Sequence, residues 1–118
     1  LFNEEKWKEA LKCYKKAIKL KPEDAGLYIK KGNALRKLNR NLEAVKCYND
    51  AIKLRPDEFE AYYKKATALR GMDLNVEAIQ CYDQAIKIKP DYAAVYLHKG
   101  YALDYIGRHL EAIECYDE

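Results

Sequence analysis

The chain has 118 residues, of which 49% are hydrophobic and 35% are charged, and its formal net charge is +3. This composition suits a folded protein with a large surface, and so small a net charge does not favour nucleic-acid binding, which usually needs a more basic balance. No apolar run approaches the roughly 18 residues of a membrane span, and the charged beginning of the chain does not resemble a signal peptide.

The first predicted element is an amphipathic helix that runs up to Lys21. Leu11, Tyr14 and Ile18 fall on one face at helical spacing, while lysines occupy the opposite face. Pro22 ends this helix, because the residue before a proline is pushed out of helical geometry. The stripe therefore predicts a helix with one side packed against a neighbour.

A second helix is predicted from about Ala25 to Leu38, with Asp24 as its N-cap. Asn39 follows the helix and belongs to a residue type that tolerates the left-handed conformation found at many helix ends. Gly32 lies mid-helix, where a small residue indicates close approach of two helices. We expect alanine to be tolerated at this position and leucine to overpack it.

A third helix is predicted from about Leu42 to Leu54. The connection that precedes it has only three or four residues, so the two helices must run antiparallel and form a hairpin. The apolar residues expected to face inward from this helix are Leu42, Val45, Tyr48 and Ile52.

The same hairpin is repeated along the chain at intervals of 34 residues. A fixed period of this size predicts a stacked repeat protein, in which each unit buries its apolar face against its neighbours. The interval relates Pro22, Pro56 and Pro90; Cys13, Cys47, Cys81 and Cys115; Tyr14, Tyr48, Tyr82 and Tyr116; and Ala10, Ala44, Ala78 and Ala112.

These positions resemble the tetratricopeptide repeat, a helix-turn-helix unit of 34 residues. The residues that carry the resemblance are Tyr28, Gly32, Ala44, Tyr48, Ala51 and Pro56, and they recur in the next unit as Tyr62, Ala66, Ala78, Tyr82, Ala85 and Pro90. The resemblance implies an all-α fold, a right-handed superhelical solenoid of antiparallel helix-turn-helix repeats. Departures are mild, the clearest being lysine at positions 31, 65 and 99, where the family usually has an apolar residue.

By this resemblance the chain divides into four parts of one array. Residues 1–24 form the second helix of a truncated repeat, residues 25–58 and 59–92 are complete repeats, and residues 93–118 are an incomplete repeat. The chain therefore looks like a segment of a longer array. The stripe of Trp7, Leu11 and Ile18 should then lack a partner, which predicts end-to-end self-association.

The four cysteines are predicted to be free thiols. Equivalent positions on neighbouring helices lie about 10 Å apart, beyond the roughly 7 Å between Cα atoms that a disulfide allows. No pair of cysteines has the spacing of a zinc site. Free thiols favour a reducing, cytoplasmic location.

The resemblance also implies that ligands bind in a concave groove formed by the first helix of each repeat. The partner expected there is an extended peptide or protein with apolar anchors and some acidic residues, and membrane binding is not expected. The predicted groove residues are Ile29, Lys30, Asn33, Arg36, Lys37, Tyr63, Lys64, Thr67, Arg70, Leu97, His98, Tyr101 and Tyr105.

Two positions recur as ladders across these helices: Lys30, Lys64 and His98 with a cationic bias, and Ile29, Tyr63 and Leu97 with an apolar character. An exposed apolar ladder would indicate an interaction surface. The alternative is that the apolar residues pack between neighbouring helices and the lysines are simply solvated.

No catalytic constellation, metal site or cofactor site is predicted. The two histidines lack a partnered nucleophile, and no phosphate-binding glycine-rich loop is present. The favoured interpretation is a protein–protein interaction scaffold without chemistry of its own. Two alternatives remain open: a targeting arm of a larger enzyme, and a nucleic-acid-binding repeat, which acidic residues in the groove disfavour.

Overall fold

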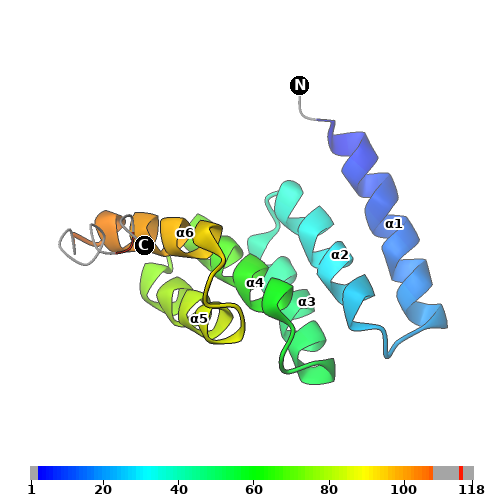
Figure 1. The fold of residues 1–118 in the computed structure, drawn as a ribbon. Coiled ribbons are helices and arrows are strands. Elements are labelled where there is room, and N and C mark those ends of the chain that lie inside the picture. The colour runs from blue at the N-terminus through cyan, green and yellow to red at the C-terminus, as the bar shows by residue number, and fades with distance from the viewer. Residues whose placement is uncertain (1–2, 108–114, 116–118) are drawn as a thin grey trace.

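A computed structural model of the protein describes residues 3–107 and residue 115, and all regular structure in that part of the chain is helical (Figure 1). The second helix of the last predicted hairpin lies outside the described residues. The helices are α1 (Glu4–Leu20), α2 (Ala25–Lys37), α3 (Asn41–Leu54), α4 (Phe59–Gly71), α5 (Asn75–Ile88) and α6 (Ala93–Tyr105).

The six helices form an elongated stack of 47 × 32 × 20 Å. Each helix packs against the next in the sequence, and in addition α2 contacts α4 and α4 contacts α6. Figure 1 shows the resulting row, with α1 at one end and α6 at the other. The first helices of successive hairpins thus form one layer, and the predicted all-α helical repeat fold is confirmed.

The turn inside each hairpin uses the left-handed backbone conformation expected at Asn39. The φ angles are 61° at Asn39, 61° at Asp73 and 81° at Gly107. Asparagine and aspartate enter this region more readily than other side chains, and glycine does so without steric cost. Asn39 and Asp73 thus permit the sharp reversals that make α3 antiparallel to α2 and α5 antiparallel to α4.

The turn between hairpins is closed by a tyrosine hydroxyl. Tyr28 donates to the carbonyl oxygen of Pro22 at 3.0 Å, and Tyr62 donates to Pro56 at the same distance. Tyr96 makes the equivalent bond in the third hairpin, at 2.6 Å. Carbonyls just beyond a helix end lack an intrahelical partner, so this bond satisfies them and fixes the direction of the following helix.

The predicted cap at Asp24 is present, because its Oδ1 accepts a hydrogen bond from the backbone N–H of Gly26 at 3.0 Å. The equivalent residues are Glu58 and Tyr92, and neither makes a side-chain cap bond. Side-chain capping is therefore found at only one of these three first helices, whereas the tyrosine–proline bond is common to all.

The core of each hairpin contains a fully buried tyrosine of its second helix, Tyr48 in α3 and Tyr82 in α5. Gly32 lies directly against the first of these rings: a Cβ atom on Gly32 would be 2.6 Å from Tyr48 Cε1. A Cβ atom at this distance requires the Tyr48 ring to move, so the packing disfavours alanine at this position, contrary to the expectation from sequence. Ala66, the equivalent residue in the next hairpin, lies in packing that already accommodates its methyl group.

Two further expectations about apolar residues are wrong. Leu42 was predicted to face inward, but it is 62% exposed, because it lies on the outer side of the hairpin in the first turn of α3. Leu11 was predicted to lack a partner, but it is only 5% exposed and belongs to the core, with Trp7 packed against it. The stripe on α1 is covered by α2, so it no longer supports end-to-end association.

Cys13, Cys47 and Cys81 are free thiols. Cys47 and Cys81 are buried, and burial raises the pKa of each thiol, which makes both poor nucleophiles. Cys13, at the equivalent position of α1, is exposed.

We predict that Gly32→Ala destabilises the chain by about 1 kcal/mol, since overpacking typically costs about 1–3 kcal/mol and the higher helix propensity of alanine recovers at most about 1 kcal/mol. Urea unfolding followed by circular dichroism measures this loss. Gly26→Ala is the matched control, because a Cβ there would meet only the Asp24 side chain. A Gly32→Ala variant at least as stable as the parent would contradict the packing described.

A second prediction concerns alkaline pH. Burial raises the pKa of Tyr48 to about 12, with the nearby Arg36 opposing the shift, whereas an exposed tyrosine titrates near 10. Between these values the folded chain keeps a proton that the unfolded chain has released, so the free energy of unfolding falls as the pH rises above about 10.

Urea unfolding at about pH 8 and about pH 11 should show this loss in the parent and a smaller one in Tyr48→Phe. Parallel losses in the two proteins would show that Tyr48 does not carry the effect.

Candidate functional site

The layer formed by the first helices of the hairpins, α2, α4 and α6, is called the inner layer, and its outward face the inner surface. Polar side chains on this surface are hydrogen-bonded to the core tyrosines. The hydroxyl of Tyr48 donates to Asn33 Oδ1 at 2.6 Å, and the hydroxyl of Tyr82 lies 3.2 Å from Thr67 Oγ1. Asn33 and Thr67 occupy equivalent positions of α2 and α4. The buried ring thus reaches through each hairpin and fixes a polar group on its inner surface.

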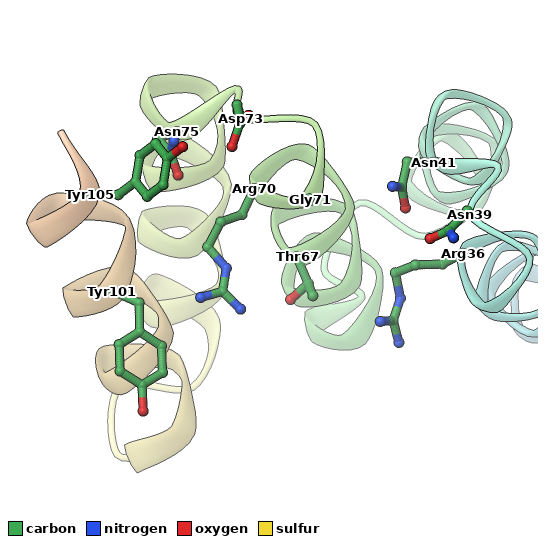
Figure 2. Close-up of a pocket in the computed structure, with 10 residues that line it drawn as sticks. All are labelled: Arg36, Asn39, Asn41, Thr67, Arg70, Gly71, Asp73, Asn75, Tyr101 and Tyr105. Carbon is green, nitrogen blue, oxygen red and sulfur yellow. The ribbon is translucent and has the colours of Figure 1, made fainter. Parts of the chain in front are cut away.

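A first hollow of about 520 Å³ lies where the inner layer meets the turns inside the hairpins (Figure 2). Figure 2 shows two arginine side chains, from α2 and α4, on either side of Thr67, with two tyrosines of α6 closing the opposite wall. The lining residues are Arg36, Asn39, Asn41, Thr67, Arg70, Gly71, Asp73, Asn75, Tyr101 and Tyr105.

A second hollow of about 470 Å³ lies at the other end of α4. Its wall is aromatic: the ring of Phe59 is 5.0 Å from that of Tyr92 and 5.9 Å from that of Tyr63. Lys89 lies over the Phe59 ring at 4.9 Å, and Lys64 lies over the Tyr63 ring at 5.6 Å. Asp57, Glu58, Glu60 and Ile88 complete the lining. The hollow combines apolar faces with charges of both signs.

His98 connects the two regions. Its ring centroid lies 5.6 Å from that of Tyr63 and 5.8 Å from that of Tyr101, and Arg70 Nη2 is 3.1 Å from its Nδ1. Since arginine can only donate, Nδ1 accepts this bond in the neutral ring. Burial, followed by the charges of Arg70 and Lys64, lowers the pKa of His98, so the imidazole is neutral at pH 7.

The predicted cationic ladder of Lys30, Lys64 and His98 does not form one charged row, because Lys64 lines the second hollow, Lys30 lines neither hollow and the His98 ring is neutral. Lys30 is exposed. Burial, and then the charge of Arg36, lowers the pKa of Lys64. With His98 neutral, the positive charge in the first hollow comes from Arg36 and Arg70.

The structure brings together most of the predicted groove residues. Arg36, Thr67, Arg70, Tyr101 and Tyr105 line the first hollow, and Tyr63 and Lys64 line the second. Asn33 and His98 contact these residues or their supporting tyrosines. Lys30, Lys37 and Leu97 are exposed and line neither hollow.

Ile29 is placed differently from the rest of this set. It is only 5% exposed and packs in the hydrophobic core. The alternative considered for the apolar ladder, packing between helices, therefore holds for Ile29.

The residues that sequence reasoning missed lie on the turns or at the starts of helices. Asn41 and Asn75 line the first hollow at equivalent positions of the repeat, as do Asn39 and Asp73. Their spacing of 34 residues was the available signal, but none of them lies on the face of a first helix. Phe59 and Tyr92 were missed in the second hollow for the same reason, since they lie at or just before the starts of α4 and α6.

Among the residues that the structure describes, no group of three or more histidine, cysteine, aspartate or glutamate side chains is arranged to hold a metal ion. No helix in the same part of the chain is both long and apolar enough to cross a membrane.

The chain belongs to the tetratricopeptide repeat family. The TPR repeat family matches residues 1–39, 32–71 and 75–104, and a second tetratricopeptide repeat family matches residues 93–118. Repeats of this family are typically non-catalytic scaffolds for protein interaction. No curated protein matches the chain.

Solved structures of MamA, a tetratricopeptide repeat protein, are similar to this chain. One crystal structure of MamA is 28% identical with a TM-score of 0.88, and the match covers 94% of this chain and 65% of the MamA chain. Another is 27% identical with a TM-score of 0.89, and the match covers 94% of this chain and 61% of the MamA chain. A MamA RS-1 ArsTM double mutant, 21% identical with a TM-score of 0.87, shares the fold, and the match covers 95% of this chain and 63% of the mutant chain. The chain thus spans somewhat less than two thirds of these proteins.

We predict that Arg70→Gln raises the pKa of His98, because it removes a positive charge and a hydrogen bond that both favour the neutral ring. The titration of the His98 ring protons by NMR measures this pKa. Lys46→Gln is the control: it removes the same charge from α3, outside both hollows, and places there the residue found at the equivalent position 80. A pKa of His98 equal in the parent and in Arg70→Gln would contradict the arrangement.

Proposed function

We propose that this chain binds an extended peptide segment of a partner protein along the inner surface of α2, α4 and α6, and that it does so without catalysis. The observation that carries the proposal is the pair of hollows at opposite ends of α4, joined by the aromatic contacts of His98. Large ligand-sized hollows with convergent polar groups are the usual places for recognition.

The spacing of the hollows suits a short stretch of extended chain. Glu60 lines one hollow and Arg70 the other, and ten residues of helix span about 15 Å. Four or five extended residues cover about the same distance. A peptide crossing α4 can therefore occupy both hollows at once.

The exposed aromatic residues provide the apolar part of this surface. Tyr92 lines the second hollow, Tyr101 and Tyr105 line the first, and all three are exposed. Aromatic side chains commonly supply most of the affinity at protein interfaces, whereas charges at the rim mainly steer association. We infer that the bound peptide carries apolar anchors for these rings.

The charges lining the second hollow favour a peptide over a nucleic acid. Asp57, Glu58 and Glu60 line it, so a phosphate backbone that crossed α4 would meet repulsion there. We also propose a reducing compartment such as the cytoplasm, in keeping with the free thiols of Cys13, Cys47 and Cys81.

A displayed library of random linear peptides tests this function. We expect enriched peptides to bind the parent, and Tyr101→Ala or Lys64→Ala to weaken binding about tenfold, a loss typical of interface hot spots. Leu42→Ala is the matched control, because it removes an exposed apolar side chain from the outer side of α3.

Amide NMR spectra of the complex give an independent readout. The resonances perturbed by peptide should belong to α2, α4 and α6. Enriched peptides that bind all variants equally, or that perturb mainly α3 and α5, would refute binding on the inner surface.

A further inference from the structure

The first hollow holds two guanidinium groups, those of Arg36 and Arg70, and neither forms a salt bridge with a carboxylate of the residues that the structure describes. Arg36 and Arg70 occupy equivalent positions of α2 and α4, and Figure 2 shows their side chains on either side of Thr67. Arg70 also lies over the Tyr101 ring at 5.6 Å and donates to His98, which limits its movement. A rigidly held guanidinium is well suited to directional recognition of an anion.

Two buried polar atoms of the same hollow have no hydrogen-bond partner among the described residues: Arg36 Nε, which is a donor, and Asn75 Oδ1, which is an acceptor. Asn75 is only 4% exposed. Buried polar groups in proteins are nearly always paired, and a missing partner calls for an explanation such as a bound ligand. A ligand that pairs both atoms must therefore place an acceptor near Arg36 Nε and a donor near Asn75 Oδ1.

The shape of the hollow comes from a position at which the repeats differ. The residue following Arg70 is Gly71, and a Cβ there would lie 3.3 Å from Asn41 Nδ2. In the next repeat the same position is Tyr105, which lines the same hollow as Asn75. Gly71 thus leaves the space beside Asn41 open, and Tyr105 forms part of the far wall.

We propose that the first hollow is a carboxylate-binding subsite, in which an aspartate or glutamate side chain of the bound peptide lies between Arg36 and Arg70. This inference rests on the proposed function and assigns the chemistry of one part of the groove. The carboxylate accepts from Arg36 Nε and from the guanidinium of Arg70, and a backbone N–H of the peptide supplies a donor for Asn75. An acidic residue in a peptide carries both groups at once.

A carboxylate fits this hollow better than a phosphate does. Asp73 belongs to the same lining and would repel a dianion more strongly than a single negative charge. The flat edge of a guanidinium also matches the two oxygens of a carboxylate, which allows two parallel hydrogen bonds.

Three pools of terminally blocked peptides test the subsite. Each pool has a fixed central residue, glutamate, glutamine or phosphoserine, with tyrosine and aliphatic residues randomised on both sides. The glutamate pool should bind at least about tenfold more tightly than the glutamine pool and should shift the Nε–H resonance of Arg36 in ¹⁵N spectra. Arg36→Gln and Arg70→Gln should each remove most of the preference for glutamate over glutamine. Arg70→Lys should remove part of it, since lysine keeps the charge but lacks the paired N–H donors of the guanidinium.

Lys46→Gln is the control for loss of charge and should keep the full preference. Circular dichroism checks the fold of every variant, and the two Arg70 variants decide the matter if Arg36→Gln does not fold. Equal binding of the glutamate and glutamine pools, with groove resonances still shifting, would overturn the subsite while leaving the peptide groove intact. Tighter binding of the phosphoserine pool would overturn the carboxylate assignment, and no binding by any pool would contradict both proposals.

Discussion

Tyr48 and Tyr82 join the interior of each hairpin to its inner surface. The ring of Tyr48 packs against Gly32 so closely that even a methyl group on that residue would collide with it. The hydroxyl of the same side chain donates to Asn33, on the surface that faces the proposed ligand. One side chain therefore sets both the distance between two helices and the position of a polar group in the groove, and Tyr82 repeats the arrangement with Thr67.

The repeats are alike where they pack and different where they face a ligand. The buried tyrosines, alanines and small residues recur every 34 residues, because each hairpin must offer the same face to its neighbours. On the inner surface the equivalent positions diverge: Arg36 and Arg70 are followed by Asp104, and Lys37 by Gly71 and Tyr105. These departures shape the first hollow, so the proposed function places specificity in the positions that break the period.

Sequence reasoning predicted the fold well because the period and the turn residues carry local physical meaning. The left-handed residue at Asn39, the cap at Asp24 and the ends of α2 and α3 all follow from short stretches of sequence. Leu11, Ile29 and Leu42 were misjudged, since helical spacing defines a stripe but does not say which neighbour covers it. The asparagines of the first hollow were missed because their proximity depends on how separate hairpins stack, which no local pattern encodes.

The central claim is that stacked hairpins hold their first helices in one layer and that this layer is the binding surface. A crystal structure of the chain with a peptide selected for tight binding tests this claim most directly. The account predicts continuous peptide density across α2, α4 and α6, with an acidic side chain between Arg36 and Arg70 and an apolar side chain against the exposed tyrosines. Peptide density on the outer helices α3 and α5, with both hollows empty, would contradict it.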